Sequence, residues 1–257
     1  GVVRTRHLGF QVAGGLLNRW LYGRAADYVV TTGEATRSML IQTLHLNPQR
    51  VVSVPTGIDV TRYRPGDRNA ARSALGLEPG AFIIGIVATL RSGKGHRFLV
   101  SALADPKLAQ AILIIVGDGP QERSLRKRVA ELDLTKRVVF AGRQPDVVPW
   151  LQACDAFVLP STAIEGAPQA LMQAMACGLP VVTTPMGAIP ELVQDGVTGL
   201  FVPPGDTQEL VEALYRIQRD KIFAAGLGNA ARKFAETKCT MTAMLDSMEN
   251  IFLKISS

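Results

Sequence analysis

The sequence predicts an α/β fold with a doubly wound parallel sheet, because short apolar segments alternate with helical patterns along most of its 257 residues. Six segments have the almost uninterrupted apolar composition of buried strands: residues 82–88, 112–116, 138–141, 156–159, 181–184 and 200–202. Strands of this kind, separated by helices, are typical of a parallel sheet that helices cover on both faces. Glycine-containing loops follow several of them, at the carboxyl ends of strands where ligands of such sheets usually bind.

Helical patterns fill the intervals between these strands. They predict helices at residues 96–103, 121–132, 147–153, 168–177, 189–193 and 207–218. Residues 225–255 have enough helical pattern for one or two further helices at the C-terminal end. The polar residues 62–69 are instead expected to form a loop.

The first part of the chain repeats the alternation on a smaller scale. It predicts strands at residues 2–5, 28–31 and 51–54 and helices at residues 16–24 and 34–44. A doubly wound domain usually has about 100 residues or more, so we interpret this part as the end of an α/β domain that is incomplete here. The predicted division of the chain is 1–54 for this domain, 55–225 for a complete second domain and 226–257 for the C-terminal helices.

The composition is that of a globular protein, with 47% hydrophobic and 19% charged residues. The longest apolar run, residues 81–90, is too short to span a bilayer, which takes about 20 residues, and the first residues do not read as a signal peptide. Cys154, Cys177 and Cys239 have neither metal-ligand nor redox-motif spacing. We therefore expect buried, reduced thiols in a cytoplasmic protein.

The net charge of +6 is concentrated at the front, where residues 1–50 hold six arginines against Asp27 and Glu34. A basic patch there could meet an anionic membrane surface or an anionic acceptor, or remain a solvated face without a partner. Nucleic acid is not expected as a partner, since no nucleic-acid motif is visible and the aromatic residues are not interleaved with the arginines.

Residues 165–182 predict a loop, a buried helix and a strand in close succession. Pro168 suits the first helical position, where its missing N–H has no cost, and Gly178 suits the residue that ends a helix. The residues between them are apolar on almost every side. Glu165 adjoins the free N–H groups of the first turn, an end that attracts anions. A carboxylate there can also accept hydrogen bonds from sugar hydroxyls.

Two cations, Arg91 and Lys94, lie on a glycine-containing loop after the strand at 82–88. Diphosphate is the expected partner, since Arg offers a planar fork of donors and Lys a compact charge; the alternative is a solvated basic turn. Residues 116–120 contain Gly-Asp-Gly, but Glu122 stands where a dinucleotide fingerprint needs its third glycine, which excludes NAD binding.

Together these motifs resemble the retaining glycosyltransferases of family 4, the glycosyl transferases group 1, which have the GT-B fold of two Rossmann-like domains. In that family two Glu residues precede an A-x-A-x-G-x-P-V segment. Glu165 matches the first, which contacts hydroxyls of the donor sugar. Gln173 stands in place of the second, which contacts the nucleotide ribose; a Gln can still hydrogen-bond a ribose, but without charge.

The resemblance implies roles for further residues. Arg91 and Lys94 would neutralise the leaving diphosphate, and His7, after the first strand, would face the donor sugar. Gly142 and Arg143 would lie beside the nucleobase, whereas Gly117 would either let the backbone approach the nucleotide or form only a turn. Residues at the start of the buried helix would offer backbone N–H groups to phosphate or sugar oxygens, except at the proline: Gly166, Ala167, Pro168 and Gln169.

As a member of this family, the protein would move a sugar from a nucleoside diphosphate sugar to a glycan or lipid-linked acceptor with retention of configuration. No metal or other cofactor is implied. The resemblance is closest to bacterial enzymes of lipopolysaccharide or capsule synthesis, which act in the cytoplasm at the inner membrane face. Two alternatives stay open. A nucleotide-sugar epimerase of the same fold would need more acidic and His residues in its cleft, and a non-catalytic nucleotide-sugar-binding module is favoured by Gln173 and the incomplete first domain.

Overall fold

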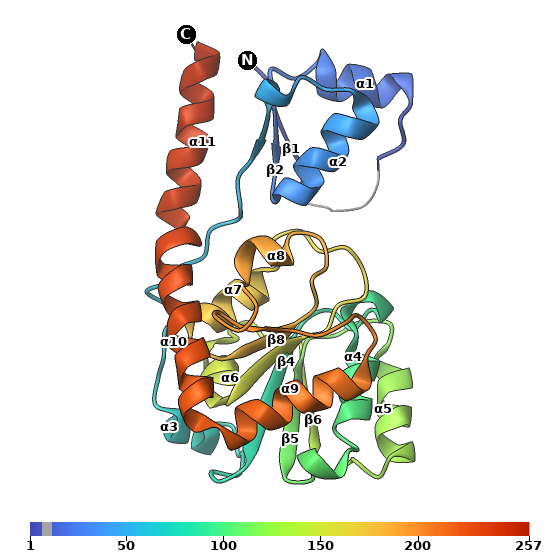
Figure 1. The fold of residues 1–257 in the computed structure, drawn as a ribbon, viewed down its shortest axis with the longest axis vertical. Coiled ribbons are helices and arrows are strands. Elements are labelled where there is room, and N and C mark those ends of the chain that lie inside the picture. The colour runs from blue at the N-terminus through green and yellow to red at the C-terminus, as the bar shows by residue number, and fades with distance from the viewer. Residues whose placement is uncertain (7–11, 257) are drawn as a thin grey trace.

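The computed structural model describes residues 1–6 and 12–256. Two parallel sheets form two lobes, one above the other in Figure 1, and the chain crosses between them twice. The smaller N-terminal lobe contains three parallel strands in the order of their numbers: β1 (Val3–Arg6), β2 (Tyr28–Thr31) and β3 (Val51–Ser53). Its helices are α1 (Leu16–Gly23) and α2 (Glu34–Leu44), followed by the short 3-10 turn η1 (Pro48–Arg50).

The larger C-terminal lobe has a six-stranded sheet in the order β6-β5-β4-β7-β8-β9, and all neighbouring strands are parallel. Its strands are β4 (Phe82–Val87), β5 (Ala111–Val116), β6 (Val138–Gly142), β7 (Ala156–Leu159), β8 (Val181–Thr183) and β9 (Leu200–Phe201). All six predicted strands are present. The predicted α/β fold with parallel sheets is therefore confirmed.

Both faces of this sheet are buried, as the apolar strands predicted. Ile83 and Ile84 are neighbours in β4, both fully buried, and belong to separate core clusters on opposite faces. The helices and 3-10 turns that cover or connect the strands are α3 (Arg68–Ala74), η2 (Ser92–Lys94), α4 (His96–Ala102), η3 (Pro106–Leu108), α5 (Glu122–Glu131), α6 (Val148–Ala153), α7 (Gln169–Ala176), α8 (Ile189–Leu192) and α9 (Thr207–Arg219).

The C-terminal helices connect the lobes. Helix α10 (Lys221–Lys238) packs on the C-terminal lobe, and α11 (Met241–Ser256) returns along the N-terminal sheet (Figure 1). Ile251 of α11 is buried with Val30 of β2 and Val54. Helix α10 begins earlier than the predicted residue 225, because Asp220 caps it by accepting a 2.9 Å hydrogen bond from the Phe223 N–H.

Two other helix starts differ from the sequence expectation. The predicted loop 62–69 ends early, since Asp67 caps α3 by accepting hydrogen bonds from the Asn69 and Ala70 N–H groups. Pro168 is not the first helical residue. Its extended ψ of 111° makes it the N-cap of α7, with its carbonyl accepting from Leu171. The end of α7 is as predicted, with Gly178 at a left-handed φ of +75°.

Candidate active site

A cleft of about 670 Å³ lies between the lobes, at the carboxyl ends of β4 and β7. The C-terminal lobe contributes most of its lining. The N-terminal lobe contributes Thr32, just after β2, and the crossing segment contributes Thr56. The position agrees with the rule that ligands of parallel α/β sheets bind beyond the carboxyl ends of the strands.

The two loops that frame the cleft, after β4 and after β7, are joined through their backbones. The Gly93 carbonyl accepts a 2.8 Å hydrogen bond from the Thr162 N–H. Gly95 has a left-handed φ of +74°, and a Cβ there would collide with the Pro160 carbonyl oxygen. Only glycine permits both the conformation and the close approach. The loop carrying the two cations is thereby held against the loop carrying the carboxylate.

Lys94 and Glu165 meet in this cleft as an ion pair. The Lys94 Nζ lies 2.7 Å from Glu165 Oε1 and 2.8 Å from Oε2. The Ser161 hydroxyl donates a 2.5 Å hydrogen bond to Oε1, so the loop before Glu165 helps to position the carboxylate. Glu165 is only 8% exposed. A lysine ammonium has three N–H donors, so an incoming anion can still be bound by the one that Glu165 does not use.

The backbone of Glu165 is supported by the turn before α8. The Glu165 carbonyl accepts a 3.0 Å hydrogen bond from the Ala188 N–H. Gly187, with φ +64°, lies so close that a Cβ would collide with the same carbonyl. Glu165 is therefore fixed by contacts to both its side chain and its backbone.

Arg91 also lines the cleft, on the same loop as Lys94, and its side chain is exposed to solvent. The structure thus brings together the two cations that the sequence singled out. Among the described residues that line the cleft, Arg91 and Lys94 contribute two positive charges and Glu165 one negative charge, so the local field favours an anion such as a diphosphate. Thr89, on the same loop, lines the cleft as well.

The segment that leads into α7 forms another part of the wall. Its four predicted residues all line the cleft: Gly166, Ala167, Pro168 and Gln169. Their segment leads directly from Glu165 into the N-terminal turn of the helix, where unpaired N–H groups and the helix dipole favour anions. Gln173 lies one turn further along α7 and is partly exposed.

The other predicted residues lie elsewhere. Within residues 1–6 and 12–256, the lining of the cleft does not include Gln173, Gly117, Gly142 or Arg143. Gly117 has a φ of +132°, and a Cβ there would collide with the Ala88 carbonyl oxygen. It therefore lets the turn after β5 pack under the cation-bearing loop. His7 falls outside the described residues.

Two residues that lie outside the loops after β4 and β7 also line the cleft and were not singled out from the sequence, namely Thr32 and Thr56. Each carried a usable signal, because Thr32 follows a predicted strand at its carboxyl end and Thr56 lies in the Pro-Thr-Gly-Ile-Asp turn. Threonine is common in such loops for local reasons, so residue type alone did not mark them.

Several buried titratable groups lie outside the cleft. Burial, with a smaller contribution from the Lys94 charge, lowers the pKa of His96 to about 4. Burial also raises the pKa of the Cys154 and Cys177 thiols to about 12 and that of Cys239 to about 11. All three thiols are free and buried, as the sequence predicted.

The described residues contain no group of three or more His, Cys, Asp or Glu side chains that could hold a metal ion. None of the described helices combines the length and apolar character needed to cross a membrane.

Comparison with known proteins gives a consistent result. The family model of the glycosyl transferases group 1 matches residues 81–220. A D-inositol 3-phosphate glycosyltransferase of Saccharomonospora viridis is 33% identical over 238 residues, which are 86% of this chain and 55% of that protein. A GDP-mannose-dependent monoacylated alpha-(1-6)-phosphatidylinositol monomannoside mannosyltransferase of Corynebacterium glutamicum is 32% identical over 211 residues, covering 77% of this chain and 55% of that protein.

Among solved structures, Anabaena Alr3699/HepE in complex with UDP and glucose is similar with a TM-score of 0.83 and 27% identity, covering 89% of this chain and 64% of that one. The chain spans about half the length of the curated relatives that it matches.

Proposed function

The chain belongs to the glycosyl transferases group 1, and from this membership we propose that it binds a nucleoside diphosphate sugar and takes part in transferring the sugar to an acceptor. The observation that carries the proposal is the Lys94–Glu165 pair, a cation and a carboxylate 2.7 Å apart in a cleft at the carboxyl ends of β4 and β7. A diphosphate needs the cation, and sugar hydroxyls need a carboxylate that accepts hydrogen bonds.

In this proposal different residues bind different parts of the donor. Lys94 and Arg91 bind the diphosphate and stabilise the negative charge that develops on it as the glycosidic bond breaks, an electrostatic contribution of the kind that usually dominates catalysis. Glu165, held by Ser161, orients the donor sugar. Backbone N–H groups at the start of α7 bind further phosphate or sugar oxygens.

The roles proposed for the remaining residues are supported only by the family resemblance. Gln173 would contact the ribose, Gly142 and Arg143 the base, and His7 the donor sugar, while the position of Gly117 favours a packing role. Retention of configuration and independence of a metal ion rest on the same resemblance. The cations on the loop after β4 offer the charge neutralisation that a metal supplies in other transferases.

For the acceptor we propose a glycan or lipid-linked molecule of the bacterial cell envelope. The curated relatives described above are named for inositol phosphate and phosphatidylinositol mannoside acceptors, rather than for lipopolysaccharide or capsule. Both names describe acceptors with a phosphate group, and the arginine-rich N-terminal lobe suits an anionic acceptor of that kind.

A cytoplasmic location at an anionic membrane surface completes the proposal. Helix α1 has no buried residue and exposes Leu16, Leu17 and Trp20 beside Arg19, a composition that suits a membrane interface. Co-sedimentation with phosphatidylglycerol vesicles, but not with phosphatidylcholine vesicles, is the expected result. Trp20→Ser should weaken it, whereas Ile222→Ser, which removes an apolar side chain that is 88% exposed on α10, should not. Equal binding by all variants would contradict the contact.

The donor proposal is tested by calorimetric titration of the folded chain with UDP, GDP and ADP. One of them should bind, and Lys94→Ala should weaken its binding by about tenfold or more, since charge-assisted hydrogen bonds are worth about 1.5–3 kcal/mol. Lys107→Ala is the matched control, because it also breaks a Lys–Glu ion pair, with Glu212, but far from the cleft. Absence of binding, or equal loss in both variants, would contradict the proposal.

A further inference from the structure

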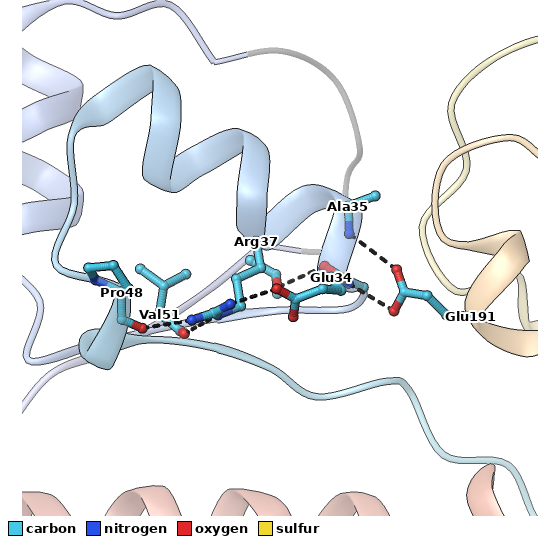
Figure 2. A network of polar contacts seen from close by, with 8 residues as sticks. Glu34, Ala35, Arg37, Pro48, Val51 and Glu191 are labelled. Carbon is cyan, nitrogen blue, oxygen red and sulfur yellow. Dashed lines mark hydrogen bonds and ion pairs between the residues drawn. The ribbon is translucent and has the colours of Figure 1, made fainter.

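Glu191 of α8 makes a contact that the donor site does not require. Its carboxylate accepts hydrogen bonds from two backbone N–H groups of the other lobe, at 2.8 Å from Glu34 and at 3.1 Å from Ala35. Figure 2 shows the side chain reaching across the gap between the lobes to the first turn of α2. Glu191 lies in the first turn of α8, within the helix predicted at residues 189–193. Its carboxylate, however, caps a different helix.

Helix α2 has no N-terminal cap of its own. Its N-cap residue is Gly33, which has no side chain that could accept hydrogen bonds from the free N–H groups of the first turn. A Cβ at Gly33 would collide with the Cβ of Ala188, the residue that precedes α8. The missing side chain therefore lets the lobes approach and leaves the N–H groups for Glu191, whose negative charge also suits the positive end of the helix dipole.

The capped turn is firmly attached to the rest of the N-terminal lobe. The Arg37 guanidinium donates to the Val51 carbonyl at 2.6 Å, to the Pro48 carbonyl at 2.9 Å and to Glu34 Oε1 at 2.6 Å (Figure 2). These bonds connect α2 to β3, whose chain continues into the crossing segment. The first turn of α2 is thus attached to the strand that leads out of the lobe.

On the other lobe, the same contact leads directly to the candidate active site. Glu191 and Ala188 belong to one short turn and helix, and the Ala188 N–H donates to the Glu165 carbonyl at 3.0 Å. The contact therefore joins the N-terminal lobe to the segment that supports the site carboxylate.

The lobes are also connected at one edge, where the two crossings run together beside α10 and α11 (Figure 1). The Ile58 N–H donates to the Cys239 carbonyl at 2.8 Å, and the Met241 N–H donates to the Ile58 carbonyl at 3.2 Å. Gly57 packs on this pair so closely that a Cβ would lie 2.6 Å from the Thr240 carbonyl oxygen. Two hydrogen-bonded crossings of this kind form a hinge, since few residues absorb any rotation between the lobes.

We propose that Glu191 is a positioning residue that closes the cleft: by capping α2 from the opposite lobe, it holds the N-terminal lobe, with Thr32, over the segment that carries Glu165. The hinge permits the lobes to separate, and the cap favours the closed arrangement. Both N–H groups of the cap lie in an exposed region, so water can replace the carboxylate when the lobes separate. The cap therefore changes the arrangement of the lobes rather than the stability of either one.

The test measures the distance between the lobes by double electron–electron resonance, without any nucleotide, so its outcome does not depend on donor binding. Spin labels are placed on Gln42→Cys in α2 and on Lys136→Cys in the C-terminal lobe, both at exposed positions. The three native thiols are buried and escape labelling. Amide hydrogen exchange of Glu34 and Ala35 is followed in parallel.

Glu191→Ala should lengthen and broaden the distance distribution and accelerate exchange of the two amides by about tenfold or more, the effect of losing hydrogen bonds to a charged acceptor. Glu191→Gln keeps an acceptor oxygen and most of the side chain's shape, so it should change the distances and the exchange less. This variant also allows the test if Glu191→Ala does not fold. Glu34→Gln is the matched control, because it removes a carboxylate at the same turn but leaves both N–H groups bound to Glu191.

The proposal is overturned if both Glu191 variants keep the distance distribution and the amide protection of the unmodified chain. It is equally overturned if Glu34→Gln shifts the distances as much as Glu191→Ala does, since a general loss of charge at this turn would then explain the effect.

Discussion

Lys94 and Glu165 are 71 positions apart in the chain, yet the Lys94 ammonium lies within 2.8 Å of both oxygens of the Glu165 carboxylate. The pair is assembled by two loops whose backbones are hydrogen-bonded to each other. In this pair the two charges neutralise each other. A bound diphosphate would therefore compete with Glu165 for the lysine, and the balance between them can be measured.

Glu165→Gln should separate binding of the nucleotide from binding of the sugar. Without the carboxylate, Lys94 loses a competitor for its charge, so the nucleoside diphosphate of the proposed donor should bind at least as tightly as before. The additional affinity contributed by the sugar of the corresponding nucleotide sugar should disappear. Calorimetry with both ligands checks this. A large loss of nucleotide affinity would instead mean that Glu165 holds Lys94 in place for the diphosphate.

Gly117→Ala should destabilise the fold by at least about 2 kcal/mol, because the residue has a conformation that side chains rarely adopt and a Cβ would collide with the Ala88 carbonyl. Gly142→Ala is the comparison, since Gly142 has a left-handed φ of +66° but open space around a Cβ. It should cost only about 1 kcal/mol. Urea unfolding of both variants measures the difference in the free energy of unfolding. Equal losses of stability would show that the collision with the Ala88 carbonyl is not the reason for glycine at position 117.

Stability should fall as the pH is lowered from about 6.5 towards 4. The folded-state pKa of His96, about 4, lies below its ordinary value of 6.5, so the unfolded chain binds the proton first. The stabilisation is complete above pH 6.5 and is lost progressively below it, by up to about 3 kcal/mol. Urea unfolding at several pH values should show this loss. It should shrink in His96→Leu and persist in His45→Asn, a control at an exposed histidine.

The cysteines should resist a thiol reagent in the native chain at pH 8. All three are buried, and a thiol with a pKa of about 12 is ionised to only about one part in ten thousand at that pH. Ellman's reagent should detect no free thiol until denaturant is added and three afterwards. Rapid reaction of one thiol in the folded chain would show local opening, and Cys239 at the hinge is the residue to examine first.

Local patterns predicted the elements of this protein well. The apolar runs identified all six strands of the larger sheet, and Gly178 correctly marked the end of α7. These signals depend on neighbours within a few residues, because the apolar pattern of a strand and the residues that end a helix are local features of the sequence. The early starts of α3 and α10 were missed, since the capping residues Asp67 and Asp220 lie within polar segments that also read as loops.

Part of the candidate site could likewise be derived from the sequence. The cations after β4 and the carboxylate before α7 were recognisable because the carboxyl ends of parallel strands meet at one edge of the sheet. Gly117 and Arg143 also follow strands of that sheet, yet they do not line the cleft that the described residues form. Strand ends alone therefore did not determine which loops face the cleft.

The sequence by itself determined the α/β architecture, the order of its elements and the residue types available at the strand ends, because burial and backbone conformation act over short stretches of chain. Only the tertiary structure decided that Lys94 pairs with Glu165, that Gly117 serves packing and that Glu191 caps α2, which lies 157 positions away. Such contacts depend on how loops and lobes far apart in the sequence approach one another. That approach follows from the packing of the whole core, and no local pattern encodes it.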